Sequence, residues 1–583
     1  MKYRKPITLL VLCIAALSLI ATVCGIFSKQ GPGEYDFTSI YSQTITIYGK
    51  GVVNGLKEGE TAEFQVITFN KTPFQSVKIV KDELNLGGTV FHPRIVEDQF
   101  NNKYARYTLT KNGEFYYEII TDINRIANIP ELIDFEIKEP KSDVKQYTEP
   151  SEKIESNSIE IINLVKNKLV TNNFINNLHE TIFWVNDYVE YAKGDEFNKY
   201  YLQQKTAVET LLTRKGVCDE FSNLAAAMLR TKNIPTKMAI GITYDGKAWG
   251  NHAWLEVYND KQNTWIPSDP TFREAGFVDA THLKMGSFSD ISLSIAKATY
   301  PKTANVTFDT QSKLPKVEIK QINYFDLITI NSKETELKEN TWNEITVEMT
   351  NNTNRIITAP ISILENYNEL IFQKKKQTET LQPYETKEVI FYIYPKINLE
   401  QNQYAKGTIT FNSLSSPKKQ SITIVKNPNT KTNGELIIED ITPITHGEKL
   451  LIQIKATNYY NTPKTIDYNI TSNSLNIKQT EEIPPFNSKI IETELNDYKN
   501  QSYLINIQTP TSTYTQTITT TQQTLIIEKP IEKQTVVEQK IDTNNTNPQE
   551  NILIQNPLIL LVGILIIVGL LLLGIFWTNK RYI

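Results

Sequence analysis

Cysteine is scarce in this chain, which contains only three cysteines among 583 residues. Cys13 and Cys24 lie in an apolar run near the N-terminus, so Cys218 is the single cysteine of the long region that follows. A lone cysteine cannot close a disulfide within that region, and the lack of a CxxC pair excludes the common cysteine-based zinc and redox motifs. The sequence therefore predicts neither a disulfide scaffold nor a cysteine-ligated metal.

Histidine is also rare, and neither sign of charge dominates. The five histidines are scattered along the chain and do not form a metal-binding pattern, so we expect no metal and no cofactor. The 61 Lys and Arg residues nearly balance the 65 Asp and Glu residues, which gives a formal net charge of −4. A chain close to neutral gives no electrostatic reason to expect nucleic acid as a partner.

Two long apolar runs predict membrane segments, one near each end of the chain. Residues 7–27 follow a basic N-terminus and form either a signal peptide or an uncleaved anchor. We favour the anchor, because no clear cleavage site follows the run. Residues 557–577 are uncharged and precede Lys580 and Arg581, as in a transmembrane helix with a cytoplasmic tail. Both basic ends belong inside, so the bulk of the chain is expected to lie outside the cell membrane. Six Asn-x-Ser/Thr sequons are compatible with an external glycoprotein: Asn70, Asn305, Asn351, Asn469, Asn500 and Asn544.

The length allows several domains, and the pattern of residues changes along the chain. Residues 31–150 show short alternating runs, with a hairpin signal at Asn112-Gly113, and predict an antiparallel β domain. Residues 311–430 and 431–528 repeat strands at the spacing of β-sandwich, Ig-like modules. The remaining predicted segments are the anchor or signal peptide 1–30, a stalk 529–553, the transmembrane helix 554–577 and the tail 578–583.

Residues 151–310 combine helical spacing with strands and predict an α+β core. Apolar residues at helical spacing predict helices at 159–169 and 174–189, a short helix at 206–213, and another from Cys218 to about Thr231. Strand patterns follow at 237–243, 252–258 and 264–267, with a turn-rich connector at 259–263. A helix packed on such an antiparallel meander is an α+β arrangement.

Cys218, His252 and Asp269 are the candidate catalytic residues. A thiol at a helix N-terminus is shifted toward the reactive thiolate. If the strands carrying His252 and Asp269 pair, Asp269 comes level with His252 and can orient its imidazole. The backbone N–H of Cys218 is a plausible oxyanion donor, and Trp184 or Tyr191 could supply the second. Taken singly, each triad residue has a structural alternative: a packed cysteine, a structural histidine and a turn-forming aspartate.

The neighbours of these residues decide between the two interpretations, because together they resemble the core of the transglutaminase-like superfamily. The resemblance covers roughly residues 156–272 and is carried by five stretches: WVNDYVEY at 184–191, RKGVCDEFSNL at 214–224, RTKNIPT at 230–236, NHAWLEVY at 251–258 and WIPSDPT at 265–271. It implies a papain-like fold in which Cys218 is the nucleophile, His252 the general base and acid, and Asp269 the orienting residue. His282 is expected to be structural, because the resemblance already assigns the base.

The sequence therefore predicts a membrane-anchored extracytoplasmic thiol enzyme acting on amide or peptide bonds. Its expected substrate is a protein, a peptide or a cell-envelope component, and hydrolysis and transamidation both remain open. The alternative is a non-catalytic surface binding or assembly protein that uses the same fold as a platform. The oligomeric state and the identity of the substrate lie beyond the sequence.

Overall fold

The computed structural model describes residues 38–534, apart from 128, 245–247, 291–295, 310–314, 365–366, 402, 416, 428–433, 497, 521–524 and 528–530. The chain divides after Thr535 into two units, and all described residues belong to the first. The two predicted membrane segments, most of the predicted stalk and the predicted tail lie outside the described residues. Within the described part, no helix is long and apolar enough to span a bilayer.

The N-terminal part is built from two antiparallel sheets, as its alternating pattern predicts. Their cores meet around Phe64, whose ring contacts those of Phe115 and Tyr117. The strands of the first sheet are β1 (Thr38–Asn54), β3 (Gln75–Leu86), β4 (Thr89–Phe91) and β7 (Gly113–Ile126), and those of the second are β2 (Ala62–Ile67), β5 (Arg94–Glu97) and β6 (Lys103–Leu109). The predicted hairpin signal at Asn112-Gly113 stands directly at the start of β7.

Three later strands return to these N-terminal sheets. They are β14 (Ala296–Thr299), which pairs with β2, and β15 (Asn305–Asp309) and β16 (Lys316–Tyr324), which both pair with β1. The sheets thus join segments that the predicted boundaries at residues 150 and 310 separate. Strand periodicity shows which face of a strand is buried but not which partner it pairs with, so the sequence pattern contained no sign of this return.

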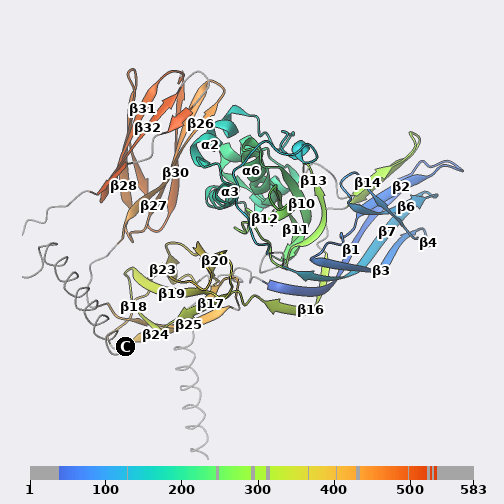
Figure 1. Ribbon diagram of the computed structural model, residues 1–583, viewed down its shortest axis with the longest axis horizontal. Helices are drawn as coiled ribbons and strands as arrows, with labels where there is room; N and C mark the ends of the chain where they lie inside the picture. The colour runs from blue at the N-terminus through green and yellow to red at the C-terminus, as the bar shows by residue number, and fades with distance from the viewer. Residues whose placement is uncertain are drawn as a thin grey trace, which may run out of the picture. The chain divides into compact units, whose positions relative to one another are not determined.

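The middle of the chain is the expected α+β core. Its helices are α2 (Ile159–Lys168), α3 (Phe174–Tyr188), α4 (Asp195–Leu202), α5 (Ala207–Thr213) and α6 (Cys218–Thr231), and its sheet has the order β12 (Thr264–Ser268), β11 (Trp249–Asn259), β10 (Thr236–Tyr244), β13 (Leu283–Phe288). Figure 1 shows α6 against this sheet, and their side chains share one apolar core. The sequence missed α4 and β13, and placed the other elements within about three residues of their observed ends.

The alternating pattern of residues 252–258 predicts that His252 and Trp254 share one face of β11 and that Leu255 and Val257 lie on the other. The structure confirms that Trp254 is separated from Leu255 and Val257. Leu255 and Val257 lie in the core that the sheet shares with α6, whereas Trp254 packs with Ala239 and Val278 in a separate cluster. Successive side chains of a strand point to opposite faces, so His252 lies on the Trp254 face of the sheet. The same alternation leaves the backbone of Ala253 beside α6, where the Ser222 hydroxyl donates to the Ala253 carbonyl at 3.2 Å.

Two β-sandwiches follow, each with one apolar core between two sheets. The first contains β17 (Ile328–Ser332), β19 (Asn343–Asn351), β21 (Leu370–Phe372) and β23 (Thr386–Pro395) in one sheet, and β18 (Thr335–Lys338), β20 (Ile357–Ile363), β22 (Lys376–Leu381), β24 (Tyr404–Asn412) and β25 (Lys418–Val425) in the other. The second contains β26 (Leu436–His446), β27 (Lys449–Asn458) and β30 (Ser488–Asn496) opposite β28 (Lys464–Thr471), β29 (Asn476–Ile483), β31 (Ser502–Gln508), β32 (Ser512–Thr520) and β33 (Leu525–Ile527), with β34 (Ile531–Gln534) paired to β32.

The two sandwiches repeat one stabilising device. Asn351 ends β19 and donates its side-chain N–H groups to backbone carbonyls that include Gln382. Asn458 ends β27 and donates in the same way to Ile483 and Pro484. Both asparagines begin Asn-rich stretches of the sequence, NNTN at 351–354 and NYYN at 458–461. Because Asn351 is fully buried by these bonds, its sequon is not accessible for glycosylation in the folded chain.

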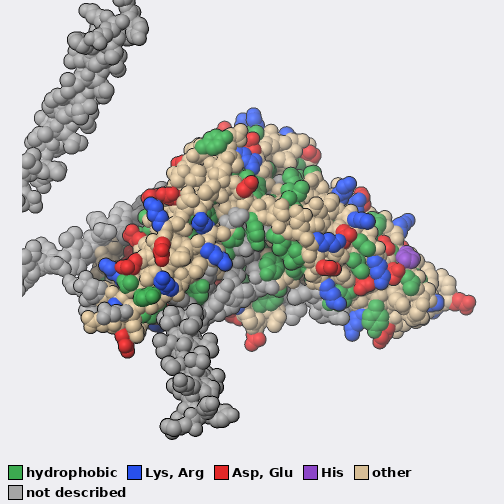
Figure 2. All heavy atoms as spheres, turned by 90° about the horizontal axis from the view of Figure 1, so that it is seen from below, with side chains coloured by type: hydrophobic (Ala, Val, Ile, Leu, Met, Phe, Trp, Pro, Cys, Tyr) green, Lys and Arg blue, Asp and Glu red, His purple; other side chains and the backbone are tan. Residues whose placement is uncertain are grey.

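The surface carries both signs of charge. Figure 2 shows Lys, Arg, Asp and Glu side chains interspersed over one face of the described residues. Many form exposed ion pairs, such as Lys81 with Glu118 at 2.8 Å and Lys449 with Glu494 at 2.7 Å. Exposed pairs of this kind contribute about 0–1 kcal/mol each, so stability rests mainly on the apolar cores.

Candidate active site

The start of α6 is fixed by a buried glutamate. Glu220 accepts the backbone N–H of Val217 at 2.8 Å with one carboxylate oxygen and that of Lys205 at 2.7 Å with the other. Glu220 packs so closely on Gly216 that an added Cβ there would lie 2.2 Å from the Glu220 Cβ. The glycine break in the sequence is therefore required by a close approach, and it sets where the helix begins.

Cys218 is the first residue of α6, as predicted, and only 7% of its surface is exposed. Burial raises the pKa of its thiol well above the usual value, and the charge of neighbouring Asp219 adds to this effect. A hydrogen bond from the backbone of Ala253 acts in the opposite direction and favours the thiolate. The thiol donates to Asp219 Oδ1 at 3.6 Å. The position at the helix N-terminus alone therefore does not lower the pKa of this thiol.

His252 and Asp269 come together as the strand pairing predicts. β11 and β12 are antiparallel, with Leu255 opposite Ser268, so Asp269 follows the last paired residue of β12. His252 Nε2 lies 2.5 Å from Asp269 Oδ2. The other oxygen, Oδ1, accepts the backbone N–H groups of Thr271 at 2.6 Å and Phe272 at 3.1 Å. The turn after Asp269 thus holds the carboxylate, and the carboxylate orients the imidazole.

β11, the strand that carries His252, also contacts the thiol of Cys218. The Ala253 backbone reaches the thiol of Cys218, and Ala253 is the residue next to His252. Since Asp269 engages Nε2 of His252, Nδ1 is the ring nitrogen left for the thiol. The Phe272 ring stacks on the imidazole with centroids 4.9 Å apart and planes 12° apart, which restrains its rotation.

His282 is a residue of this site whose position the sequence did not reveal. Its Nε2 lies 2.9 Å from Asp269 Oδ2, the same oxygen that binds His252, and its Nδ1 lies 3.1 Å from Asp279 Oδ1. Glu274 Oε2 is 3.7 Å from Nε2. The close spacing of Asp279 and His282 was the available signal, but nothing local connects the pair to Asp269.

The electrostatics of this cluster differ from those at the thiol. Burial by itself lowers the pKa of His282, but the charge of Glu274 and the hydrogen bonds to Asp269 and Asp279 raise it to about 10. Burial by itself raises the pKa of Asp269, but the charges and hydrogen bonds of His252 and His282 bring it well below its usual value. Asp269 is therefore an ionised carboxylate, completely buried and held by four hydrogen bonds.

Two groups in this cluster have enough ligand atoms close together to suggest a metal: His252 with Asp269 and His282, and Glu274 with Asp279 and His282. The nitrogen-to-oxygen distances of 2.5 and 2.9 Å in the first group are those of direct hydrogen bonds. An ion with ligand bonds of about 2.0 Å in tetrahedral geometry would hold these atoms more than about 3 Å apart. The first group, which contains the triad residues, is therefore arranged for proton sharing rather than for metal ligation.

The two candidates for a second oxyanion donor lie in different surroundings. Tyr191 is in β8 (Glu190–Tyr191), which pairs with β9 (Lys215–Gly216) just before Cys218. Trp184 stacks on Tyr188 in α3, with ring centroids 4.2 Å apart. The pairing places the backbone of Tyr191 beside Gly216, two residues before Cys218, so Tyr191 is the better of the two candidates.

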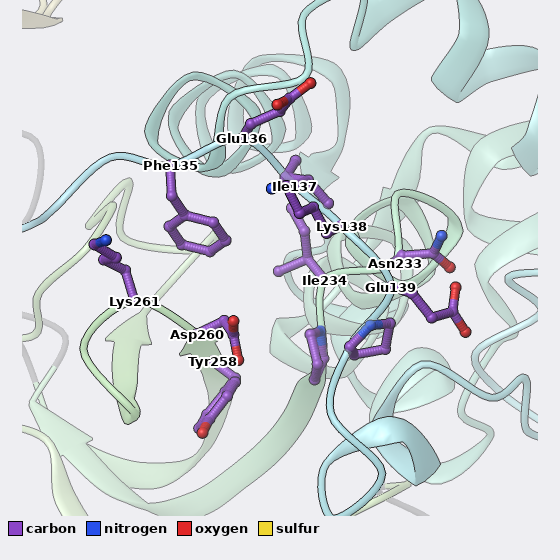
Figure 3. Close-up of a pocket in the computed structure, with 12 residues that line it drawn as sticks. Phe135, Glu136, Ile137, Lys138, Glu139, Asn233, Ile234, Tyr258, Asp260 and Lys261 are labelled. Carbon is purple, nitrogen blue, oxygen red and sulfur yellow. The ribbon is translucent and has the colours of Figure 1, made fainter.

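A pocket of about 220 Å³ lies in the same domain but away from these residues. Figure 3 shows its walls, which come from Phe135 to Pro140, the turn at Asn233 to Pro235, and the end of β11 near Tyr258. That turn follows the C-terminus of α6, and the 14 residues of the helix separate it from Cys218 by about 20 Å. The pocket is therefore not the site of the predicted chemistry.

Comparison with known proteins supports the identity of the core. Residues 167–270 match the family model of the transglutaminase-like superfamily, so this segment is a transglutaminase-like domain, as its motifs predict. A candidate cysteine protease from Cytophaga hutchinsonii is 17% identical over 52% of this chain and 96% of its own, with a TM-score of 0.35. Red sea bream transglutaminase is 11% identical over 78% and 93%, with a TM-score of 0.17. No curated protein matches the chain.

Proposed function

We propose that this chain is a membrane-anchored, extracytoplasmic thiol enzyme that acts on amide bonds through an acyl-enzyme thioester. The observation that carries the proposal is the convergence of Cys218, at the N-terminus of α6, with a strand whose His252 is bonded to Asp269. A nucleophile, a base and a group that orients the base are the parts required for this chemistry. The match of residues 167–270 to a family of transglutaminase-like proteins supports it.

The reaction follows from these positions. His252 takes the thiol proton, and the Cys218 sulfur attacks the carbonyl carbon of the amide, while the backbone N–H at the helix start stabilises the oxyanion. The C–N bond then breaks, and His252 returns the proton to the leaving amine. Water or a second amine, deprotonated by His252, attacks the thioester and releases Cys218 as a thiol. Water gives hydrolysis and an amine gives transamidation; we propose hydrolysis, because water is always available.

The buried thiol requires the site to open before a substrate can reach it. Cys218 is covered, and its neighbour Asp219 interacts with Gln204 in the segment between α4 and α5. An extended protein or peptide segment, or a cell-envelope polymer, is the proposed substrate, since the reacting group must reach the start of α6. The two sandwiches are proposed to be Ig-like modules that present the core above the membrane, with the segment after residue 528 as a stalk.

A thiol-directed probe tests the chemistry. Labelling of Cys218 by an iodoacetamide probe, read on the peptide that contains this residue, is expected to fall at least tenfold in His252→Ala. The matched control is His446→Ala, because His446 is exposed and bonded to Glu160 on the surface. Equal labelling of Cys218 in the His252→Ala protein would contradict the proposed triad.

The proposed location is tested separately in intact cells. A C-terminal tag beyond Ile583 is expected to be protected from external protease, while the described region is digested. Digestion of both parts would contradict the proposed cytoplasmic tail, without bearing on the chemistry of Cys218.

One observation favours a second function, a non-catalytic binding or assembly protein. The thiol of Cys218 is buried, and burial raises its pKa well above the usual value, as in a cysteine used for packing. This alternative predicts that a Cys218→Ser strain retains the cellular role of the protein. Loss of that role in a folded Cys218→Ser protein would exclude it.

A further inference from the structure

The carboxylate that orients His252 is shared with a second histidine. Asp269 Oδ2 receives His252 Nε2 at 2.5 Å and His282 Nε2 at 2.9 Å, and both rings are buried. The centroids of the two imidazole rings are 5.7 Å apart. His282 follows the matched segment 167–270 and belongs to none of the motifs that predicted the triad.

The hydrogen bonds of His282 identify its charge. Both of its ring nitrogens face carboxylate oxygens, Asp269 on one side and Asp279 on the other. Asp269 accepts three further hydrogen bonds, and Asp279 Oδ1 also accepts the Thr281 N–H at 2.9 Å and its hydroxyl at 2.6 Å. Both carboxylates are thus acceptors, so both nitrogens of His282 must donate. A histidine that donates from both nitrogens is an imidazolium cation.

We propose that His282 is a positioning residue of the proposed active site: as a buried cation it holds the Asp269 carboxylate and limits how strongly that carboxylate stabilises a protonated His252. The proposal rests on the catalytic role of His252 and Asp269. It explains why one carboxylate carries two imidazoles, since the charge of His282 balances Asp269 when His252 is neutral. His252 can then release its proton to the leaving amine instead of remaining trapped as an ion pair.

The surrounding charges favour this arrangement. His282 faces Asp269, Asp279 and Glu274, and its backbone carbonyl accepts Arg125 Nε at 2.9 Å from β7. On the other side of Asp269, His252 also senses the charge of Asp219 from α6. Removing the cation at His282 makes the field at His252 more negative, so His252 should keep its proton to higher pH. The interaction energy of two unit charges 5.7 Å apart, at an effective dielectric constant of 20, is equivalent to a pKa change of about two.

The test compares alkylation of Cys218 by iodoacetate and by iodoacetamide between about pH 5 and 10, in the full-length protein. The anionic reagent is favoured while the neighbouring imidazole is protonated, so the ratio of the two rates falls where His252 loses its proton. Mass spectrometry of the Cys218 peptide keeps Cys13 and Cys24 out of the measurement. The midpoint is expected to move up by about one to two pH units in His282→Gln, which removes the charge but retains an N–H donor.

Two further variants sharpen the result. His282→Asn also removes the charge but keeps an N–H donor toward Asp279, so it should move the midpoint in the same direction. His179→Gln is the matched control, because burial lowers the pKa of His179 to about 4 and its replacement removes no charge. If His282→Gln does not fold by circular dichroism, His282→Asn carries the test.

The outcomes separate the two proposals. A wild-type ratio that depends on pH and on His252, with a midpoint unchanged in a folded His282 variant, would overturn the role of His282 alone. A wild-type ratio that does not change with pH or in His252→Gln would overturn the proposed triad, and the inference with it.

Discussion

Replacement of Asp269 by asparagine is the sharpest single perturbation of this site. The change preserves size but removes the charge and turns one of two acceptor oxygens into a donor. An amide nitrogen at the Oδ1 position would face the backbone N–H groups of Thr271 and Phe272. At the Oδ2 position it would face two imidazole rings, of which His282 donates from both nitrogens. In either orientation the amide nitrogen, which is a donor, faces other hydrogen-bond donors.

The expected cost follows from what remains buried. His282 is completely buried, and without Asp269 its cation loses one of its two hydrogen-bonded carboxylates. Breaking one side of a buried, hydrogen-bonded ion pair costs about 3–5 kcal/mol. In a domain of about 150–250 residues, 1 kcal/mol lowers the melting temperature by about 2–4 °C, so the core should melt roughly 10 °C earlier. Labelling of Cys218 should also fall, because His252 loses the group that orients it.

Differential scanning calorimetry at pH 7 measures the change, with Asp260→Asn as the matched control. Asp260 pairs with Lys141 at 3.0 Å on the surface, so its replacement should shift the transition by about 1 °C or less. A melting temperature of the Asp269→Asn core within about 2 °C of wild type would refute the argument. It would mean that the bonds around Asp269 do not hold a buried charge.

Three further predictions concern the helix start and the buried cation. Asp219→Asn removes an anion beside Cys218 and should speed its alkylation by iodoacetamide at pH 7 about tenfold; no increase would contradict the assigned effect of that charge. Gly216→Ala places a Cβ 2.2 Å from the Glu220 Cβ in the first turn of α6 and should destabilise the core by about 1–3 kcal/mol, measured by thermal unfolding. Gly250→Ala is the control, because an added Cβ there meets no atom within 4 Å and should destabilise the core much less. The pKa of His282 rises from 6.5 to about 10 on folding, so its stabilisation is complete below pH 6.5 and is lost between pH 6.5 and 10; melting curves across this range should fall more steeply for wild type than for His282→Gln.

Local patterns predicted the elements of the core because each is encoded over a few residues. Apolar residues at helical spacing indicated a helix from Cys218 to about Thr231, and α6 has these bounds. Alternation in β11 separated Trp254 from Leu255 and Val257, and these side chains occupy different clusters. The strand order that brings Asp269 to His252 followed from a short connector, which allows only a neighbouring antiparallel strand. The roles of the three residues in catalysis remain predictions.

Other features depend on segments that meet only in the folded chain. The return of β14, β15 and β16 to the first sheets could not be predicted, because any alternating strand can pair with any exposed edge. His282 was expected to be structural. Only the fold places its Nε2 beside Asp269 Oδ2, the oxygen that also bonds His252. The pKa of Cys218 could not be predicted from local sequence either. The helix N-terminus favours the thiolate, but burial and Asp219 raise the pKa of the thiol.

The sequence by itself determined which residues begin the helix, which face of the strand carries the histidine, and which aspartate follows the next strand, because periodicity and turn chemistry are local. The tertiary structure alone decided how those groups are charged. Desolvation and the distances between carboxylates and imidazoles depend on everything packed around them, and a motif of ten residues cannot contain that information.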